Sequence, residues 1–167
     1  MRRFLILFPV YLLSGFTVLK ASFAQSVLSV MTGALVTVCA RLIRAFGGQA
    51  IAEGAILRTP DNSFALMVVA GCNAAHVTVL LWAAVLSFPA TWPQRAKGLA
   101  GGGAAIHAVN LIRIISLFYL GRWNRDVFDF AHVYLWESLI TIDALVVFWT
   151  WVWLIRKPGP ILHAHAA

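Results

Sequence analysis

The sequence consists mainly of long apolar stretches separated by short polar or basic segments. Three stretches, Ala74 to Trp92, Leu99 to Leu120 and His132 to Ile155, are close to or above the roughly 20 apolar residues that a bilayer-spanning helix needs. Phe4 to Leu19 is a further candidate span, and Val27 to Phe46 is a fifth apolar segment. This pattern predicts an all-α integral membrane protein with about four transmembrane helices.

The first apolar stretch has two interpretations. Arg2 and Arg3 precede it, which suits either an uncleaved membrane anchor or a signal peptide. Ser22-Phe23-Ala24 resembles a small-residue cleavage site, and we favour the uncleaved anchor. With either alternative, residue 25 lies outside the cytoplasm.

The segment from Gly47 to Gly71 interrupts the apolar pattern. Ala55 to Arg58 and Phe64 to Val69 predict two short strands, and Thr59-Pro60-Asp61-Asn62 predicts the turn between them. An open hairpin cannot face lipid, because the backbone groups along its edges would lack hydrogen-bond partners. We therefore expect this hairpin at the water interface.

Basic residues predict how the spans are oriented. The short basic loop Pro93 to Lys97 and the segment Arg156-Lys157-Pro158 should both lie in the cytoplasm by the positive-inside rule. The hairpin and the predicted loop Gly121 to Ala131 then lie outside. If Val27 to Phe46 crossed the membrane, the hairpin would lie inside. We therefore predict that this segment is an interfacial amphipathic helix and that the chain crosses four times.

Composition supports a membrane protein. Hydrophobic residues make up 61% of the 167 residues and charged residues 11%, with a mean hydropathy of +0.84, whereas soluble domains carry roughly 25% charged residues. This length leaves no room for a separate soluble domain, so residues 1–157 should form one membrane-embedded domain and residues 158–167 a disordered tail. The net charge of +7 lies mostly at the ends of apolar runs and indicates topology, not nucleic-acid binding.

Three residues carry candidate chemistry near the outer surface. Cys72 lies just before a predicted helix, whose N-terminus favours a thiolate. Arg113 lies about 10 Å below the outer surface, where a guanidinium costs several kcal/mol unless it is paired or reaches a polar cavity. His132 begins the last span. A thiol, an imidazole and a guanidinium are the groups that thiol acyl transfer requires. The alternatives are a packed Cys72 and an Arg113 that snorkels to the surface.

Other polar residues inside the spans suggest structural pairs. Asn110 lies one turn deeper than Arg113 on a nearby face, which makes simple snorkelling less favourable. Glu137 lies within a turn of Arg113 in depth and could hold its guanidinium. His107 and Asp143 have similar depths, so we expect them to pair, in preference to forming a proton path.

The motifs of the chain are specific in combination. The main ones are Gly71-Cys72-Asn73, then Asn110-Leu111-Ile112-Arg113-Ile114, then His132 near the start of the last helix. Further motifs are Ile115-Ser116-Leu117-Phe118-Tyr119-Leu120-Gly121, Trp123-Asn124-Arg125 and His132-Val133-Tyr134-Leu135-Trp136. Together with the hairpin before the cysteine, these motifs resemble the exosortase/archaeosortase family of multi-spanning, transpeptidase-like enzymes, which have an invariant Cys, Arg and His. The short length resembles the compact exosortase H branch.

The chain departs from the family pattern at two positions. The family usually has Gly two residues after the cysteine, whereas this chain has Ala74. Alanine fits there if the backbone is helical, but not comfortably if φ is positive. His76 stands where an acidic or neutral residue is expected, one helical turn after Cys72, and is a competing candidate for the catalytic base.

The resemblance implies a cysteine transpeptidase or protease of the bacterial inner membrane, multi-pass, with its active site and the hairpin facing the periplasm. Its partners would be the lipid bilayer and secreted proteins with a C-terminal sorting signal. In the exosortase H branch this signal is of the Ile-Pro-Thr-Leu type and is followed by an apolar span and a basic end. Neither a metal nor an organic cofactor nor nucleic acid is implied.

The resemblance also implies roles for individual residues. Cys72 would attack the backbone carbonyl at the sorting signal, and the resulting thioester would pass to an amine or water. Arg113 would stabilise the oxyanion, and His132 would act as general acid and base. The supporting candidates are Asn73, His76, Asn110 and Glu137. The alternative function is a non-catalytic membrane assembly or substrate-docking protein in which Cys72 is merely packed.

Overall fold

The computed structural model of the protein describes residues 2–69 and 71–156, so the tail predicted at 158–167 lies outside the described residues. The helices are α1 (Arg2–Lys20), α2 (Ser22–Ala45), α3 (Ala75–Ser87), α4 (Trp92–Trp123), α5 (Arg125–Phe130), the π-helical turn η1 (Ala131–Leu135) and α6 (Trp136–Arg156). The strands are β1 (Ile51–Glu53), β2 (Ile56–Arg58) and β3 (Ala65–Met67). The predicted all-α membrane architecture with a small antiparallel sheet is confirmed.

Four helices within the described residues are long and apolar enough to cross a membrane: Arg2–Lys20, Ser22–Ala45, Trp92–Trp123 and the continuous stretch Arg125–Arg156. The set differs from the predicted one. α3 has 13 residues, about 20 Å at 1.5 Å per residue, which is shorter than a hydrocarbon core of roughly 30 Å. α2, predicted to be interfacial, is long and apolar enough to span by length and composition alone.

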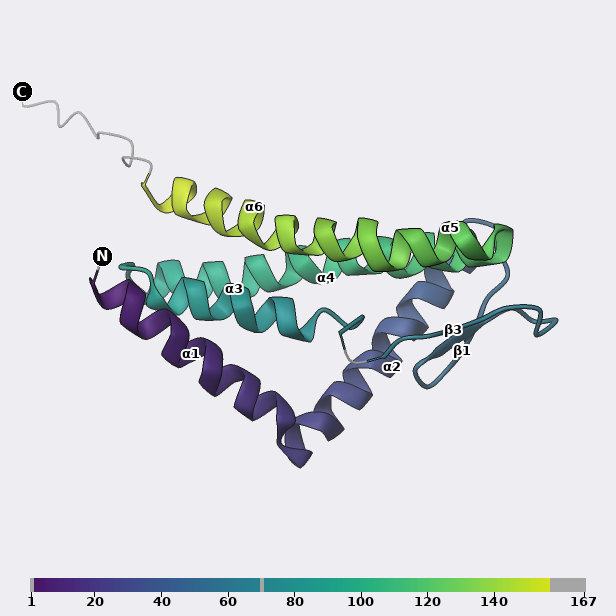
Figure 1. Cartoon of the computed structure of the whole chain (residues 1–167), viewed down its shortest axis with the longest axis horizontal. Helices are drawn as coiled ribbons and strands as arrows, with labels where there is room; N and C mark the ends of the chain where they lie inside the picture. The colour runs from purple at the N-terminus through teal and green to yellow at the C-terminus, as the bar shows by residue number, and fades with distance from the viewer. Residues whose placement is uncertain (1, 70, 157–167) are drawn as a thin grey trace, which may run out of the picture.

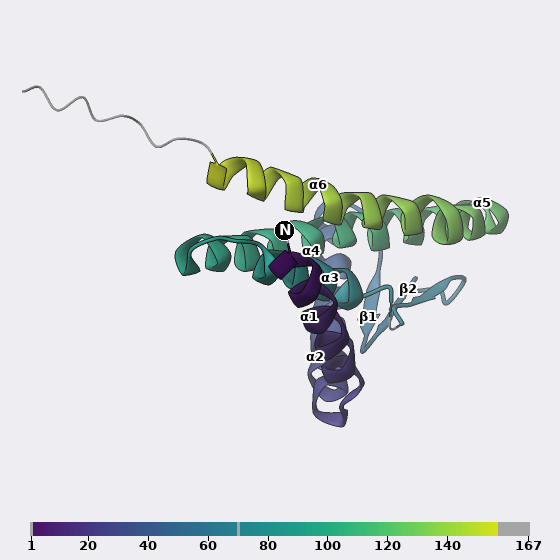
Figure 2. The same cartoon turned by 60° about the vertical axis from the view of Figure 1, so that its left-hand side comes forward.

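The helices form an elongated bundle with two distinct ends (Figure 1, Figure 2). α1 and α2 make a V, and α1 packs against α3, which in turn contacts α4 and α6. The start of α1, the connection between α3 and α4, and the end of α6 lie at one end of the bundle (Figure 1). The sheet and α5 lie at the opposite end. The predicted hairpin therefore lies at the end of the bundle opposite the basic segments at Arg2, Pro93 to Lys97 and Arg156.

The prediction of a basic loop at Pro93 to Lys97 is wrong, because these residues form the first turns of α4. Thr91 and Gln94 form a capping box, in which the Gln94 side chain accepts a hydrogen bond from the Thr91 backbone N–H at 2.9 Å. Pro93 stands in the first turn, where its missing N–H is harmless. The charged residues show that this segment meets water, but the capping residues Thr91 and Gln94 make it the start of a helix.

The prediction of a loop from Gly121 to Ala131 is also wrong, since most of this segment is helical. α4 continues to Trp123 and breaks only at Asn124, whose backbone is extended. The Asn124 side chain then accepts hydrogen bonds from the N–H groups of Asp126 and Val127, at 2.8 and 3.2 Å, and caps α5. A single capping residue therefore turns the chain between two helices.

The predicted hairpin is present as β2 and β3, and a third strand, β1, pairs antiparallel with β2. Leu57 and Leu66 point into the core that the sheet shares with α2 and α4. In the turn between β2 and β3, hydrogen bonds from the side chains of Thr59 and Ser63 lower the pKa of Asp61 to about 2. The sheet thus covers one end of the helices with its apolar face and presents a charged turn.

Two hydrophobic cores are separated along the bundle. The first joins α2, the sheet, the second half of α4 and Ala131, and Cys72 packs against it. The second joins α3, the first half of α4 and α6, and includes Ala74 and Ile106. The segment from Cys72 to Ala74 therefore lies at the boundary between the two cores.

Candidate active site

A sharp turn between β3 and α3 presents Cys72. The Cys72 N–H donates to the Val69 carbonyl at 2.9 Å, and Gly71 has φ of +99°, a conformation natural to glycine. Cys72 is half-buried and is not in a disulfide. The thiol therefore sits on a tight loop at the entrance to a helix.

Asn73 fixes this loop from both sides. Its side-chain oxygen accepts a hydrogen bond from the Ala75 N–H at 3.2 Å, in the manner of a helix cap. Its side-chain nitrogen donates to the Thr32 hydroxyl of α2 at 3.3 Å. Asn73 thus ties the start of α3 to α2 and is a structural support for Cys72. Thr32 was not predicted as its partner, because no pattern in the sequence links these two segments.

Ala74 adopts the left-handed conformation, with φ of 61° and ψ of 5°, and is 1% exposed. This is the conformation in which an alanine is strained and a glycine is not. The departure from the family pattern therefore falls at a position where the backbone favours glycine.

His132 reaches the thiol from the turn η1. Its Nε2 lies 3.3 Å from the Cys72 Sγ. Its ring stacks on Phe128, with centroids 5.7 Å apart and planes 1° from parallel. Phe128 lies four residues before His132, a spacing that signals contact on a helix, but the expectation of a loop there concealed it. The imidazole therefore lies parallel to an aromatic ring and offset from it, with its Nε2 directed at the sulfur.

Arg113 reaches the same sulfur from α4. Its Nη2 lies 3.8 Å from the Cys72 Sγ and 3.7 Å from a Glu137 carboxylate oxygen. The Arg113 side chain is 2% exposed and that of Glu137 is 71% exposed. Snorkelling is thus not how this guanidinium is accommodated: it is buried, and it faces a thiol and a carboxylate.

Asn110 is fully buried one turn from Arg113, and neither its side-chain oxygen nor its nitrogen has a hydrogen-bond partner in the described part of the chain. On α4 it lies between Ile106 of the second core and Ile114 of the first. It therefore stands at the level of the segment from Cys72 to Ala74, without a hydrogen bond to that segment.

His76 points away from the candidate site. It is exposed, and its ring lies 5.7 Å from that of Phe16 in α1. It also lines a cavity of about 340 Å³ together with Lys20 and Gln25. Across residues 2–69 and 71–156, no hydrogen bond joins His76 to Cys72, so the geometry favours His132 as the partner of the thiol.

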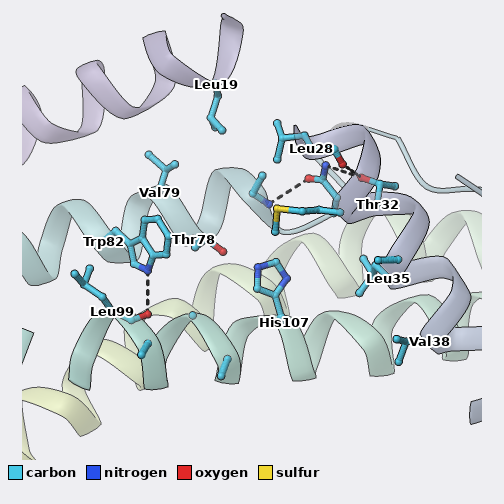
Figure 3. A pocket seen from close by; sticks show the side chains of 17 residues that line it. Leu19, Leu28, Thr32, Leu35, Val38, Thr78, Val79, Trp82, Leu99 and His107 are labelled. Carbon is cyan, nitrogen blue, oxygen red and sulfur yellow. Dashed lines mark hydrogen bonds between the residues drawn. The ribbon is translucent and has the colours of Figure 1, made fainter. Parts of the chain in front are cut away.

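The predicted pair of His107 and Asp143 does not form. Among the described residues no ion pair joins them, and one Asp143 carboxylate oxygen is buried without a hydrogen-bond partner. His107 instead points into an apolar cavity of about 590 Å³ (Figure 3). Equal depth along two helices does not ensure that their side chains face each other.

This apolar cavity lies between α2, α3 and α4, below the end of α1 (Figure 3). Leu28, Val79 and Leu99 are among its apolar lining, and small residues of α4 form part of its wall. Asn73 also lines it. The cavity therefore reaches to within one residue of Cys72.

The fold and these side chains define a class: a multi-pass membrane protein with a thiol, an imidazole and a guanidinium gathered from three elements. A family model described as Transmembrane exosortase (Exosortase_EpsH) matches residues 2–153, which include all three. The protein belongs to the exosortase family, which implies, in general, a cysteine transpeptidase. Comparisons with curated proteins and with solved structures found no match.

Proposed function

We propose that the protein is a membrane cysteine transpeptidase or protease that removes a C-terminal sorting signal and its apolar tail from secreted proteins. The observation that supports this most strongly is the approach of His132 Nε2 and Arg113 Nη2 to the Cys72 sulfur, at 3.3 and 3.8 Å. The three residues come from separate segments, and Arg113 is buried at a cost that a packed, inert cysteine would not justify.

The geometry supports a two-step acyl transfer. His132 Nε2 accepts the thiol proton, and the Cys72 sulfur attacks the scissile carbonyl carbon. Arg113 stabilises the negative oxygen that develops. The carbon–nitrogen bond then breaks, and His132 returns the proton to the leaving amine. An acceptor amine or water next attacks the thioester, giving its proton to His132, and the thiolate leaves.

The substrate would carry its sorting signal, of the Ile-Pro-Thr-Leu type, before an apolar span and a basic end. The cavity of about 590 Å³ offers apolar surface that reaches Asn73, next to the thiol. An apolar span lying along this surface would bring the preceding peptide to Cys72. Small side chains on α4, at Ala100, Gly103 and Ala104, leave room for a close approach of helices.

We place the protein in the bacterial inner membrane with the candidate site toward the periplasm. Arg2, Arg95 and Arg156 lie at helix ends opposite the sheet (Figure 1), and the positive-inside rule favours the cytoplasm for such an end. The sheet end also carries arginines, but two of them, Arg58 and Arg125, pair with Glu53 and Asp129. In a cysteine-free background, a cysteine at residue 61 should label from outside intact cells and one at residue 95 should not. The reverse result would contradict this orientation.

The main experiment is co-expression with one tailed substrate and measurement of tail removal, normalised to enzyme abundance. Cys72→Ala should reduce processing to background, and Cys39→Ala, in a buried core position, should not. Arg113→Lys keeps the charge but loses the planar fork. It should slow tail removal by about 10²–10³-fold, the cost of losing one oxyanion donor. Near-normal processing by Cys72→Ala would overturn the proposal.

The choice between the two histidines has a matched test. His132→Gln should slow tail removal by about 10²–10⁴-fold, because glutamine cannot exchange a proton near neutral pH. His76→Gln should have little effect, since His76 faces Phe16. The opposite ranking would make His76 the base.

A non-catalytic docking role is the second candidate, and the strained backbone at Ala74 is the observation that favours it. Thiol labelling separates the two functions. Cys39 is completely buried, so faster labelling of half-buried Cys72 is expected in both cases. The diagnostic result is dependence on His132: a catalytic Cys72 should label more slowly in His132→Gln, and a packed one should not.

A further inference from the structure

The turn η1 changes which residues share a face at the start of the last helix. The Trp136 N–H donates to the Ala131 carbonyl, the i→i+5 pattern of a π-helix. His132 and Glu137 are five residues apart, and in a regular α-helix five residues at about 100° each would separate them by roughly 140°. The π turn takes up one extra residue, so the fifth residue occupies the place that the fourth has in an α-helix. Both side chains therefore reach the site, His132 at the thiol and Glu137 at Arg113.

Arg113 stands between two negative or potentially negative groups. Its Nη2 is 3.8 Å from the Cys72 sulfur and 3.7 Å from the Glu137 carboxylate. In the described chain Glu137 is the one acidic residue within ion-pair distance of Arg113. Glu137 is 71% exposed and Arg113 is 2% exposed, so the carboxylate contacts the guanidinium from the surface of the bundle.

We propose that Glu137 is a positioning residue that restrains Arg113 from pairing closely with the Cys72 thiolate, and that the π turn aligns it for this purpose. This role rests on the proposed function. A guanidinium bound tightly to the thiolate would stabilise the ground state, whereas catalysis gains only from interactions that are stronger in the transition state. Glu137 keeps Arg113 available for the oxygen that becomes negative during attack.

The surroundings of the thiol allow a direct test of this charge balance. Charged or titratable groups near Cys72 are Arg113 from α4, His132 from η1 and, behind Arg113, Glu137 from α6. α2, the sheet and α5 contribute mainly apolar residues, with the buried thiol of Cys39 among them. Removing the Glu137 charge should therefore favour the Cys72 thiolate through Arg113.

The test compares Glu137→Gln with Asp129→Asn, an exposed acid that pairs with Arg125 instead. Both are made in a Cys39→Ala background, and the alkylation rate of Cys72 is followed against pH. Glu137→Gln should move the midpoint to lower pH and slow tail removal by about tenfold or more, and Asp129→Asn should do neither. An unchanged midpoint in Glu137→Gln would overturn the proposal.

Two measurements distinguish a positioning role of Glu137 from a merely structural one. A structural Glu137 would change enzyme abundance but not the alkylation midpoint. If Glu137 acts through Arg113, the shift should largely vanish in an Arg113→Ala background, and persistence of the full shift there would refute this route. Alkylation needs no substrate, so failure of tail removal with every substrate would count against the proposed function and leave the role of Glu137 separately measurable.

The register role of the π turn has its own test. Deleting exposed Tyr134 leaves His132 and Glu137 four residues apart, which keeps them on one face of a regular α-helix. Inserting one alanine after Tyr134 puts them six apart, on different faces. Tail removal should survive the deletion and be lost on insertion. Loss in both variants at normal abundance, or survival in both, would contradict the alignment.

Discussion

Ala74 allows a sharp prediction about backbone energetics beside the site. It is a non-glycine residue in the left-handed region, with φ of 61°, and it is 1% exposed. Its neighbour Ala75 is 8% exposed but begins the helix α3. The same substitution, alanine to glycine, therefore removes a similarly buried methyl group from two different backbone conformations.

Three contributions set the size of the effect. Glycine lowers the free energy of unfolding by about 0.4–1 kcal/mol because it raises the conformational entropy of the unfolded chain. Loss of the buried methyl group lowers it by about 0.8 kcal/mol. Ala75→Gly should therefore lower the free energy of unfolding by roughly 1–2 kcal/mol. At Ala74 the same losses are offset by relief of left-handed strain, about 1–2 kcal/mol. Ala74→Gly should lie within about 1 kcal/mol of the parent protein.

Unfolding by SDS in mixed micelles, followed by circular dichroism, would measure these free energies. Ala83→Gly, a buried position within α3, is a second control and should resemble Ala75→Gly. The diagnostic quantity is the difference between Ala74→Gly and the two controls. If all three variants lose the same free energy, the backbone at Ala74 is not strained.

Three further predictions concern the cavity, the buried amide and the sheet. Ala104→Phe should fill the apolar cavity and weaken processing of a tailed substrate by about tenfold, equivalent to about 1.4 kcal/mol, whereas Ala108→Phe, on α4 outside the cavity lining, should not; equal effects would argue against a tail in the cavity. Asn110→Leu should raise the free energy of unfolding by about 1–3 kcal/mol, because it removes an unpaired buried amide, and a loss of stability in SDS titration would contradict this. The pKa of Asp61 is lowered to about 2, so its stabilising contribution is complete above its unfolded-state pKa and is lost as the pH falls through about 2. Asp61→Asn should flatten the pH dependence of sheet stability at acid pH, and an unchanged acid transition would refute it.

The helical membrane fold could be predicted because it depends on long apolar stretches, which hydropathy detects directly. The ends of the helices could not. Pro93 to Lys97 and Gly121 to Ala131 both contain clustered charges, yet Thr91 and Asn124 cap helices at these places. Charge shows where a chain meets water, whereas capping decides whether it is helical there. All three strands have three residues, but only β2 and β3 flank the turn motif Thr59 to Asn62 that predicts a hairpin, whereas β1 is joined to β2 by the short turn Gly54-Ala55.

The candidate site residues could be chosen from the sequence because their chemistry is unusual at the predicted depth and because their motifs resemble those of a known family. Their contacts could not be derived in the same way. Depth along the helices predicted that Glu137 lies near Arg113, and the two side chains are 3.7 Å apart. The same reasoning predicted a pair of His107 and Asp143, which does not form. The difference lies in rotation about the helix axis. A π turn alters that rotation, and hydrophobic periodicity in the sequence does not reveal it.

The burial of Arg113 connects the fold to the proposed chemistry. A guanidinium paired closely with a buried carboxylate would be largely neutralised and would offer little to a developing oxyanion. Arg113 is 2% exposed, whereas its carboxylate partner lies at the surface of the bundle and 3.7 Å away, which is longer than a close ion pair, so positive potential remains at the thiol. Preorganised charge of this kind acts most strongly where water is excluded. The boundary between the two cores supplies such a place, since apolar residues surround the guanidinium on α4 and the thiol lies at its tip.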